Sequence, residues 1–325
     1  MSKNELTIAI CLYNAECYVI DTLSCIIAQT MQDFDLLIIN DCSTDNSAQL
    51  VGDFLKSNPK QYEIINFEKN QGLAFGRHYV ENHIDTRYIL FIDADDRPYP
   101  TLVEKLYAKI KSDSSLIAVG CYHEFIDSKG HKVGGGIFIG EKNKEDFYIK
   151  AANKKMIFMQ PTAIIDKEAL LAVGGRNIKG FPEGKPRYQD LCEDLDLWTR
   201  MSDLYVNGKA IVVIPEVLCQ YRKHEQGLSS NTLGMIIRMK HIKTNLLRRR
   251  SGQIELTFID FYDSLSSQML KLLKRDAIAA DFLRNSVFYL KKGHVFTGSY
   301  LLLKSFVLKP GYLWQKIKSN SGLFK

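Results

Sequence analysis

The chain has 325 residues, which is enough for one large domain with a smaller extension. Hydrophobic residues make up 46% of it and charged residues 25%, as in ordinary globular proteins. No apolar run reaches the roughly 18 residues that a membrane-spanning helix needs. The first residues lead into a strand-like segment without a signal-peptide pattern, so we expect a cytoplasmic protein.

Charge is distributed unevenly along the chain. From residue 232 to the end, 17 Lys and Arg stand against 5 Asp and Glu, a net charge of +12, and the remainder carries −6. An acidic body with a basic tail suggests that the tail meets an anionic partner, and the alternative is a solvated basic surface. The seven scattered cysteines contain no Cys-x-x-Cys pair, so neither a disulfide framework nor a zinc ribbon is indicated.

The first 120 residues alternate between apolar, strand-like runs and segments with helical periodicity. This order predicts an α/β fold with a mostly parallel sheet covered by helices on both faces. Such sheets bind ligands beyond the carboxyl ends of their strands. The strands are expected at Thr7–Leu12, Phe34–Asn40, Tyr62–Phe67, Tyr88–Ile92 and Leu116–Tyr122, and the helices at Tyr18–Gln29, Asn46–Lys56, Leu73–His83 and Thr101–Ser112.

The pattern changes after residue 122. The three glycines Gly134–Gly136 predict a hairpin turn, and Gly174-Gly175 ends a short helix. Strands are expected again at Ala210–Ile214 and Val217–Tyr221, and helices with apolar stripes fill the chain from Leu233 onward. We therefore predict a catalytic domain over residues 1–230 and a basic helical region over 231–325.

Three carboxylates follow the buried strand Tyr88–Ile92, in the sequence Asp93-Ala94-Asp95-Asp96. Carboxylates this close repel one another unless a cation or a helix N-terminus compensates. A hard divalent cation would do so and could also hold a diphosphate. The alternative is a solvated acidic turn that caps the next helix.

Two further clusters carry candidate chemistry. Asp194, next to Glu193 at a helix start, could remove a proton from a hydroxyl nucleophile, or both acids could simply stabilise the helix terminus. His224 at a strand end could complete a metal site, although a lone histidine is more often an ordinary hydrogen-bonded residue.

Taken together, these motifs resemble those of family 2 glycosyltransferases over roughly residues 5–230. The resemblance implies a GT-A fold and inverting transfer of a sugar from a nucleoside diphosphate donor, with a UDP-sugar expected. It rests on Thr7–Glu16, Gln29-Thr30, Phe34–Asn46, Asn70–Gly72 with Arg77, Phe91–Asp96, Gly174-Gly175, Glu193–Arg200 and Tyr221–His224.

The resemblance also implies roles for single residues. Asp194 would be the general base, and Glu193 and Trp198 would lie on the acceptor side. Asp95, Asp96 and His224 would bind Mn²⁺ or Mg²⁺. Donor binding would fall to Cys11, Tyr13, Asp41, Arg77, Asp93, Ala94 and Asp95, with Tyr13 and Asp41 at the nucleobase. The chain departs from the family pattern at Cys42, where glycine is usual, and at His78, where asparagine is usual.

The tail combines cations with apolar residues at Arg248–Arg250, Lys271–Arg275 and Tyr300–Leu308. Basic amphipathic helices of this kind lie on anionic membranes, so we expect peripheral association with the inner face of the plasma membrane. A glycan or lipid-linked saccharide is the expected acceptor. The alternative is a helical cap that packs on the body or forms a homo-oligomer, and no nucleic-acid-binding module is present.

Two other functions compete with glycosyl transfer. A nucleotidyltransferase of related fold is one, although Thr7–Glu16 lacks the glycine-rich, basic phosphate-binding segment typical of that class. The second is a scaffold that binds a nucleotide sugar without turnover. A dinucleotide-dependent oxidoreductase is disfavoured, because no Gly-x-Gly-x-x-Gly follows the first strand.

Overall fold

The structure is a computed structural model that describes residues 4–58, 62–223, 231–291 and 293–311. Contacts group the chain into two compact units. The sheet unit comprises Met1–Lys179, Cys192–Gly227 and Ile242–Glu255, and the helical unit comprises Gly180–Leu191, Leu228–His241 and Leu256–Lys325. The grouping differs from a single division after residue 230, because helix α8 (Thr232–Arg249) contributes residues to both units.

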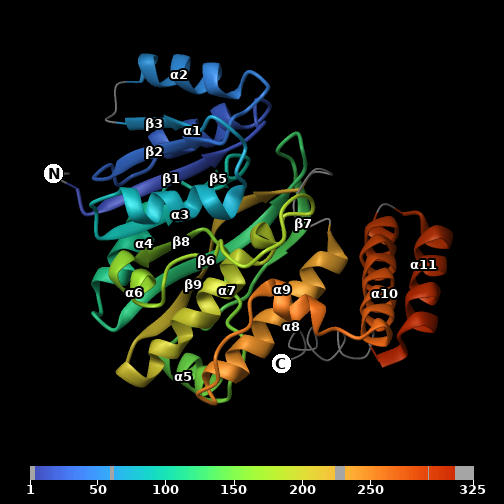
Figure 1. The fold of residues 1–325 in the computed structure, drawn as a ribbon. Helices are drawn as coiled ribbons and strands as arrows, with labels where there is room; N and C mark the ends of the chain where they lie inside the picture. Colours follow the sequence, from blue (N-terminus) through green and yellow to red (C-terminus); the bar gives the residue numbers. More distant parts are fainter. Residues whose placement is uncertain (1–3, 59–61, 224–230, 292, 312–325) are drawn as a thin grey trace. The chain divides into compact units, whose positions relative to one another are not determined.

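One sheet forms the centre of the sheet unit and holds nine strands within the described residues (Figure 1). Leu12 is level with Asn40, and Asn40 with Asn66, so the carboxyl ends of three parallel strands share one edge. The parallel half has the order β3 (Tyr62–Asn66), β2 (Asp35–Asn40), β1 (Leu6–Leu12) and β4 (Tyr88–Phe91).

The apolar runs of β1 and β2 explain this parallel half. Ile8, Ile10, Ile38 and Ile39 have no exposed surface, and strands buried on both faces need helices on both sides. The predicted alternation of strands and helices is confirmed. The helices are α1 (Val19–Ile27), α2 (Ser47–Ser57), α3 (Leu73–His83), which crosses the front of the sheet in Figure 1, and α4 (Leu102–Lys111).

The other half of the sheet mixes strand directions. Strand β8 (Ala163–Asp166) lies between β4 and β6 (Leu116–Ile126) and is antiparallel to both. Strand β9 (Ala210–Arg222) is parallel to β6, and β5 (Arg97–Pro98) is antiparallel to β9. The two separate strands expected in residues 210–221 form this one strand, because a register shift in its pairing with β6 accommodates Pro215.

Three further helices complete the sheet unit: α5 (Lys144–Ala152), α6 (Lys167–Ala172) and α7 (Glu193–Met201). The sequence interpretation did not include α5. Its start carries a recognisable signal, since the side chain of Asn143 accepts the N–H of Asp146 as an N-cap. Helix α6 ends at Gly174 and Gly175, both with positive φ, as predicted.

The prediction of a hairpin turn at Gly134–Gly136 is wrong. These glycines lie within β7 (Lys132–Ile137), which pairs antiparallel with β6. The chain reverses earlier, where the Asp127 carboxylate accepts the N–H groups of Lys129 and His131 at 2.9 Å each. Gly136 is needed for close approach instead, because a Cβ there would lie well inside contact distance of the His123 carbonyl oxygen.

The helical unit contains the start of α8, then α9 (Phe258–Asp263), α10 (Ser267–Lys291) and α11 (Val295–Leu308). Ile237, Phe258, Phe261 and Leu273 form its buried core. Helices α10 and α11 run side by side as a pair (Figure 1). No described helix is both long enough and apolar enough to cross a membrane.

Gly136→Ala should destabilise the sheet unit, because the new methyl group would force β7 away from β6. We expect a loss of about 1–3 kcal/mol in the free energy of unfolding, measured by urea denaturation. Gly52→Ala is the control, since Gly52 lies in α2, where an added methyl group would meet only open space, and this variant should gain up to about 1 kcal/mol. Equal stability of the two variants would contradict the close approach.

Candidate active site

Two loops at the carboxyl edge of the sheet are joined by hydrogen bonds. The Asn14 carboxamide oxygen accepts the Thr44 N–H at 2.8 Å, and the Ala15 N–H donates to the Ser47 hydroxyl at 2.8 Å. Asn14 and Cys42 have φ of 48° and 58°, in the left-handed region. Cys42 therefore adopts the conformation that a glycine would supply at this position, at a cost of about 1–2 kcal/mol.

Asp41 holds a third loop in place. Its carboxylate accepts the N–H groups of Gln71 and Gly72, at 2.6 and 2.8 Å, and the Asn70 carboxamide at 2.9 Å. Gly72 has φ of 96° and immediately precedes α3, so this turn requires glycine. Asp41 is buried against the start of α3, and the nucleobase contact expected for it stays a prediction.

The acidic turn after β4 is anchored from α1. The Thr22 hydroxyl lies 3.0 Å from the Ala94 carbonyl oxygen and 2.8 Å from that of Asp96, and donates to them. Asp93 and Asp95 remain partly exposed, whereas Asp96 is buried. The turn therefore presents two of its three carboxylates toward the surface.

Asp96 is engaged inside the protein. Its carboxylate accepts the Arg222 N–H at 3.0 Å, and the Arg222 guanidinium donates to the Asp95 carbonyl oxygen at 2.7 Å. Burial and the neighbouring Asp95 raise the pKa of Asp96 well above its usual range. Of the two carboxylates expected to bind a metal, Asp95 is thus the one with exposed surface.

The third expected metal ligand, His224, lies outside the described residues. Among the residues that the structure describes, no three His, Cys, Asp or Glu side chains are grouped as metal ligands. The metal ligand set inferred from the sequence therefore stays a prediction.

Five charged side chains form an ion-pair chain in the order Asp93, Arg77, Glu193, Arg176 and Glu81. All but the partly exposed Asp93 are buried, and we call this set the buried ion-pair chain. Arg77 on α3 contacts Asp93 and Glu193, and Arg176, which follows α6, contacts Glu193 and Glu81. Arg77 is 2% exposed and Arg176 is 1% exposed. Buried charges need partners of opposite sign, so this chain ties the acidic turn after β4 to the start of α7.

Asp194 follows the central carboxylate of that chain and is partly exposed at the start of α7. Burial tends to raise the pKa of Glu193, yet Arg176 and Arg77 outweigh it and lower that pKa. For Asp194 the balance is opposite, since burial and the adjacent Glu193 raise its pKa to about 6. Two neighbouring carboxyl groups thus differ: Glu193 is held ionised, and Asp194 titrates near neutral pH.

Three sequence-predicted site residues are buried, and the ligand contacts expected of them stay predictions. The guanidinium of Arg77 contacts protein carboxylates and has almost no surface for a nucleotide. Glu193, expected on the acceptor side, is buried between two arginines. Trp198 is fully buried, and its indole N–H donates to the Met159 carbonyl oxygen at 3.1 Å, so its ring belongs to the core.

The other donor-side candidates lie near the strand ends. Tyr13 is 47% exposed beyond β1, Cys11 is partly exposed, and Ala94 is buried in the acidic turn. Sequence reasoning missed Glu81, Arg176 and Thr22. Glu81 near the end of α3, four residues after Arg77 and so on the same helix face, was a possible signal, but only the fold brings Arg176 to it.

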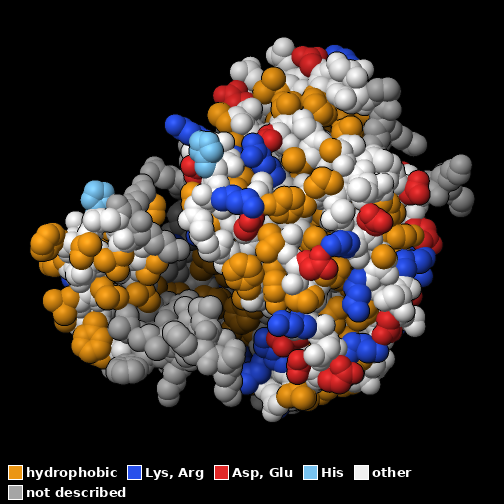
Figure 2. Space-filling model, turned by 180° about the vertical axis from the view of Figure 1, so that it is seen from behind, with side chains coloured by type: hydrophobic (Ala, Val, Ile, Leu, Met, Phe, Trp, Pro, Cys, Tyr) orange, Lys and Arg blue, Asp and Glu red, His pale blue; other side chains and the backbone are white. Residues whose placement is uncertain are grey.

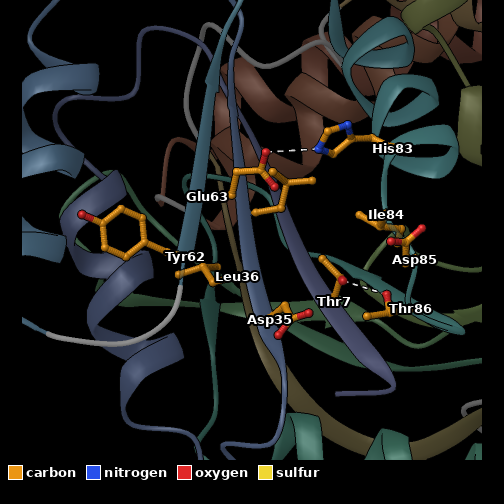
Figure 3. A pocket seen from close by; sticks show the side chains of 10 residues that line it. Thr7, Asp35, Leu36, Tyr62, Glu63, His83, Ile84, Asp85 and Thr86 are labelled. Carbon is orange, nitrogen blue, oxygen red and sulfur yellow. Dashed lines mark hydrogen bonds and ion pairs between the residues drawn. The ribbon is translucent and has the colours of Figure 1, made fainter. Parts of the chain in front are cut away.

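A cavity of about 340 Å³ lies at the opposite edge of the sheet. Figure 3 shows Asp35, Tyr62 and Glu63 at the starts of β2 and β3, with His83 directed toward Glu63 and Thr86 toward Thr7. These side chains come from the amino ends of the strands, whereas the candidate site lies at the carboxyl ends. The cavity is therefore separate from the acidic turn and Asp194.

Comparison with known proteins identifies the family of the chain. The model of the family described as "Glycosyl transferase family 2" matches residues 7–174. The chain belongs to this family. Its fold is the GT-A fold with a C-terminal helical extension, as the sequence predicted.

Three curated relatives illustrate the similarity. The teichoic acid poly(glycerol phosphate) polymerase of Staphylococcus epidermidis is 32% identical over 167 residues, 50% of this chain and 23% of the relative. Glycosyltransferase GlyA of Streptococcus pneumoniae is 28% identical over 231 residues, 70% of this chain and 32% of the relative. An uncharacterized glycosyltransferase of Haemophilus influenzae is 26% identical over 234 residues, which are 69% of this chain and 67% of the relative.

Solved structures share the fold. Staphylococcus aureus TarS, residues 1–349, in complex with UDP-GlcNAc, aligns with a TM-score of 0.54 at 16% identity and covers 96% of this chain and 92% of that one. The mannosyltransferase PcManGT of Pyrobaculum calidifontis, in complex with GDP-Man and Mn²⁺, aligns with a TM-score of 0.53 at 17% identity, covering 96% and 88%.

Arg176→Met should strongly destabilise the sheet unit, because it leaves Glu81 buried without its cation. We expect a loss of about 3–5 kcal/mol in the free energy of unfolding, measured by urea denaturation. Arg87→Met is the matched control, since it breaks an Arg87–Asp166 pair in which the arginine is 55% exposed, and it should cost less than about 1 kcal/mol. Similar losses in both variants would contradict a structural role for the buried ion-pair chain.

Proposed function

We propose that this chain is an inverting glycosyltransferase that moves a sugar from a UDP-sugar to a hydroxyl group of a glycan or lipid-linked saccharide. The observation that carries the proposal is the buried ion-pair chain, which joins the donor-side Asp93 to Glu193, the neighbour of Asp194. A transferase needs donor and acceptor groups held at fixed separation, because small displacements of reacting groups cost much of the rate. Family membership and the fold support the same reaction class.

Asp194 is the proposed general base. Its partly exposed carboxylate accepts the proton of the acceptor hydroxyl as the oxygen attacks the anomeric carbon from the side opposite the diphosphate. A pKa near 6 suits a base that must be ionised at neutral pH and still bind a proton during the reaction. Glu193 stays ionised between its arginines and orients the start of α7.

On the donor side, we assign the nucleobase to the exposed ring of Tyr13. Asp41 positions the loop before α3 by accepting its backbone N–H groups. Arg77 positions Asp93 through their ion pair, and the partly exposed Asp93 is available to the ribose or the donor sugar. Cys11 and Ala94 border the same strand ends. The identity of the base and of the sugar is the finer part of this proposal, and the UDP-GlcNAc complex of TarS supports a uridine donor.

A divalent cation, Mn²⁺ or Mg²⁺, fits the chemistry of this turn. Asp95 offers carboxylate oxygen with exposed surface beside two further carboxylates, and hard cations take oxygen ligands while keeping waters and substrate phosphates. Asp95 would hold the ion, with His224 as a second proposed ligand, and Asp96 would support the turn from inside. When bound, the ion would neutralise charge on the leaving diphosphate.

The competing functions can be separated by turnover. Nucleotidyl transfer would release pyrophosphate from a nucleoside triphosphate, or a sugar phosphate from a nucleotide sugar, whereas glycosyl transfer and donor hydrolysis release a nucleoside diphosphate. A silent scaffold would bind the donor and release nothing. A lipid-linked acceptor would also place the enzyme at the cytoplasmic face of a membrane, which is the location we propose for it.

Asp194→Asn should lower kcat by about 100-fold or more, because the amide cannot accept the acceptor proton. Release of nucleoside diphosphate measures this, and donor affinity should stay within about threefold. The wild-type kcat should rise with pH around pH 6, since Asp194 acts in its ionised form and its pKa is raised to about 6. Unchanged kcat in the Asn variant would remove Asp194 from the mechanism.

A thermal-shift screen of nucleotide sugars should identify the donor. A true donor stabilises the protein in proportion to its affinity, and we expect a shift with a UDP-sugar that grows when Mn²⁺ is added. Asp95→Ala should abolish the Mn²⁺-dependent part, and Asp53→Ala, at an exposed carboxylate on α2, is the control that should not. A response independent of Mn²⁺ would contradict the metal assignment.

A further inference from the structure

The outer face of α11 carries large apolar side chains that nothing described covers. Phe296, Tyr300, Leu303 and Val307 are 94%, 57%, 59% and 71% exposed. Their spacing of four, three and four residues places them on one face of the helix, and we call this set the α11 stripe. Hydrophobic side chains gather over this part of the molecule in Figure 2. Contiguous exposed apolar surface of this kind marks an interaction site.

In the α10–α11 pair, small residues lie between the two helices and large apolar side chains are exposed, whereas large apolar side chains are usually buried. Small residues make its contacts: the Ser305 hydroxyl donates to the Ala279 carbonyl oxygen at 2.8 Å, and both residues are buried. Gly298 lies so close to Leu290 that a Cβ would meet it at 2.5 Å. Small residues thus lie between the two helices, which leaves large apolar side chains on the outside of the pair.

The charges of the α10–α11 pair are unbalanced. The segment 267–311 has eight Lys and Arg and two Asp. Both aspartates are paired, Asp276 with Lys309 and Asp281 with Arg284, each at 2.5 Å. Exposed cations remain at Lys271, Lys274, Arg275 and Lys304. The α10–α11 pair therefore carries both exposed apolar side chains and an excess of positive charge.

We infer that the α10–α11 pair docks the enzyme on an anionic lipid bilayer, with the α11 stripe entering the interface and the exposed cations of the pair meeting the headgroups. This deepens the membrane location proposed above and rests on it, not on the chemistry at Asp194. Apolar burial and electrostatic attraction act together in such binding. Because no described helix can cross a membrane, the pair lies on the bilayer.

Two observations separate this surface from other candidates. The basic cluster of the sequence, Arg248–Arg250, is not part of it, because Arg249 and Arg250 both pair with Asp203 in the sheet unit. A second copy of the chain is a poorer occupant than a bilayer, since it would bring the same excess of positive charge against itself.

The test is co-sedimentation of the full chain with vesicles. One set is phosphatidylcholine alone, and the other is an equal mixture of phosphatidylcholine and phosphatidylglycerol. We expect wild type to bind the anionic set, and the double variant Phe296→Ser/Val307→Ser to bind it at least about tenfold more weakly. Lys274→Gln should weaken binding by about fivefold, an effect that salt reduces.

The matched control is Val206→Ser/Ile254→Ser, which removes two apolar side chains that are 70% and 87% exposed in the sheet unit. It should bind vesicles like wild type. The inference is overturned if the wild-type protein binds neither vesicle set, or if the control loses as much binding as the stripe variant. It is also overturned if the only effect of the stripe substitutions is to convert a dimer into a monomer. Nucleoside diphosphate release without vesicles should be equal in all these variants, so a failure here is distinct from a failure of the proposed reaction.

Discussion

Two guanidinium groups buried below the carboxyl edge of the sheet constrain the whole candidate site. Arg77 and Arg176 cannot be left unpaired at 2% and 1% exposure, so each must lie between carboxylates. The carboxylates come from α3, the turn after β4 and the start of α7. Satisfying these charges fixes four distant parts of the chain against one another. The proposed base and the proposed donor turn are positioned by a requirement of folding, independent of any ligand.

The sequence was informative where one local rule dominates. Strands β1, β2 and β4 are apolar runs buried on both faces, and α3 has the predicted bounds Leu73–His83. It misled where the same residues serve another purpose. Gly136 lies in a strand because β6 passes close to it, and Pro215 interrupts a pattern without ending β9. The antiparallel insertion of β8 has no local signal, because strand order depends on contacts between distant segments.

Site prediction had the same limits. The order of motifs was enough to propose roles for Asp93 and Asp194, since each follows a recognisable strand or begins a recognisable helix, and these roles stay predictions. The order of motifs could not distinguish side chains that face a ligand from side chains that position those ligand-facing residues, because that difference depends on burial. Arg77, Glu193 and Trp198 stand in the expected motifs, and burial leaves them almost no surface for a ligand. Arg176 had no motif of its own, and only its contact with Glu81 gives it a role.

The hydrogen bonds between the loops after β1 and β2 have a consequence for ligand affinity. Asn14 and Cys42 keep their left-handed backbone because partners such as Thr44 and Glu68 hold them there. A loop that is already ordered loses little conformational entropy when a ligand arrives, whereas a flexible loop would lose about 1–2 kcal/mol for each residue fixed. The conformational entropy of these loops is thus already lost when the protein folds. A larger part of the favourable energy of contacts with a nucleotide therefore remains in the free energy of binding.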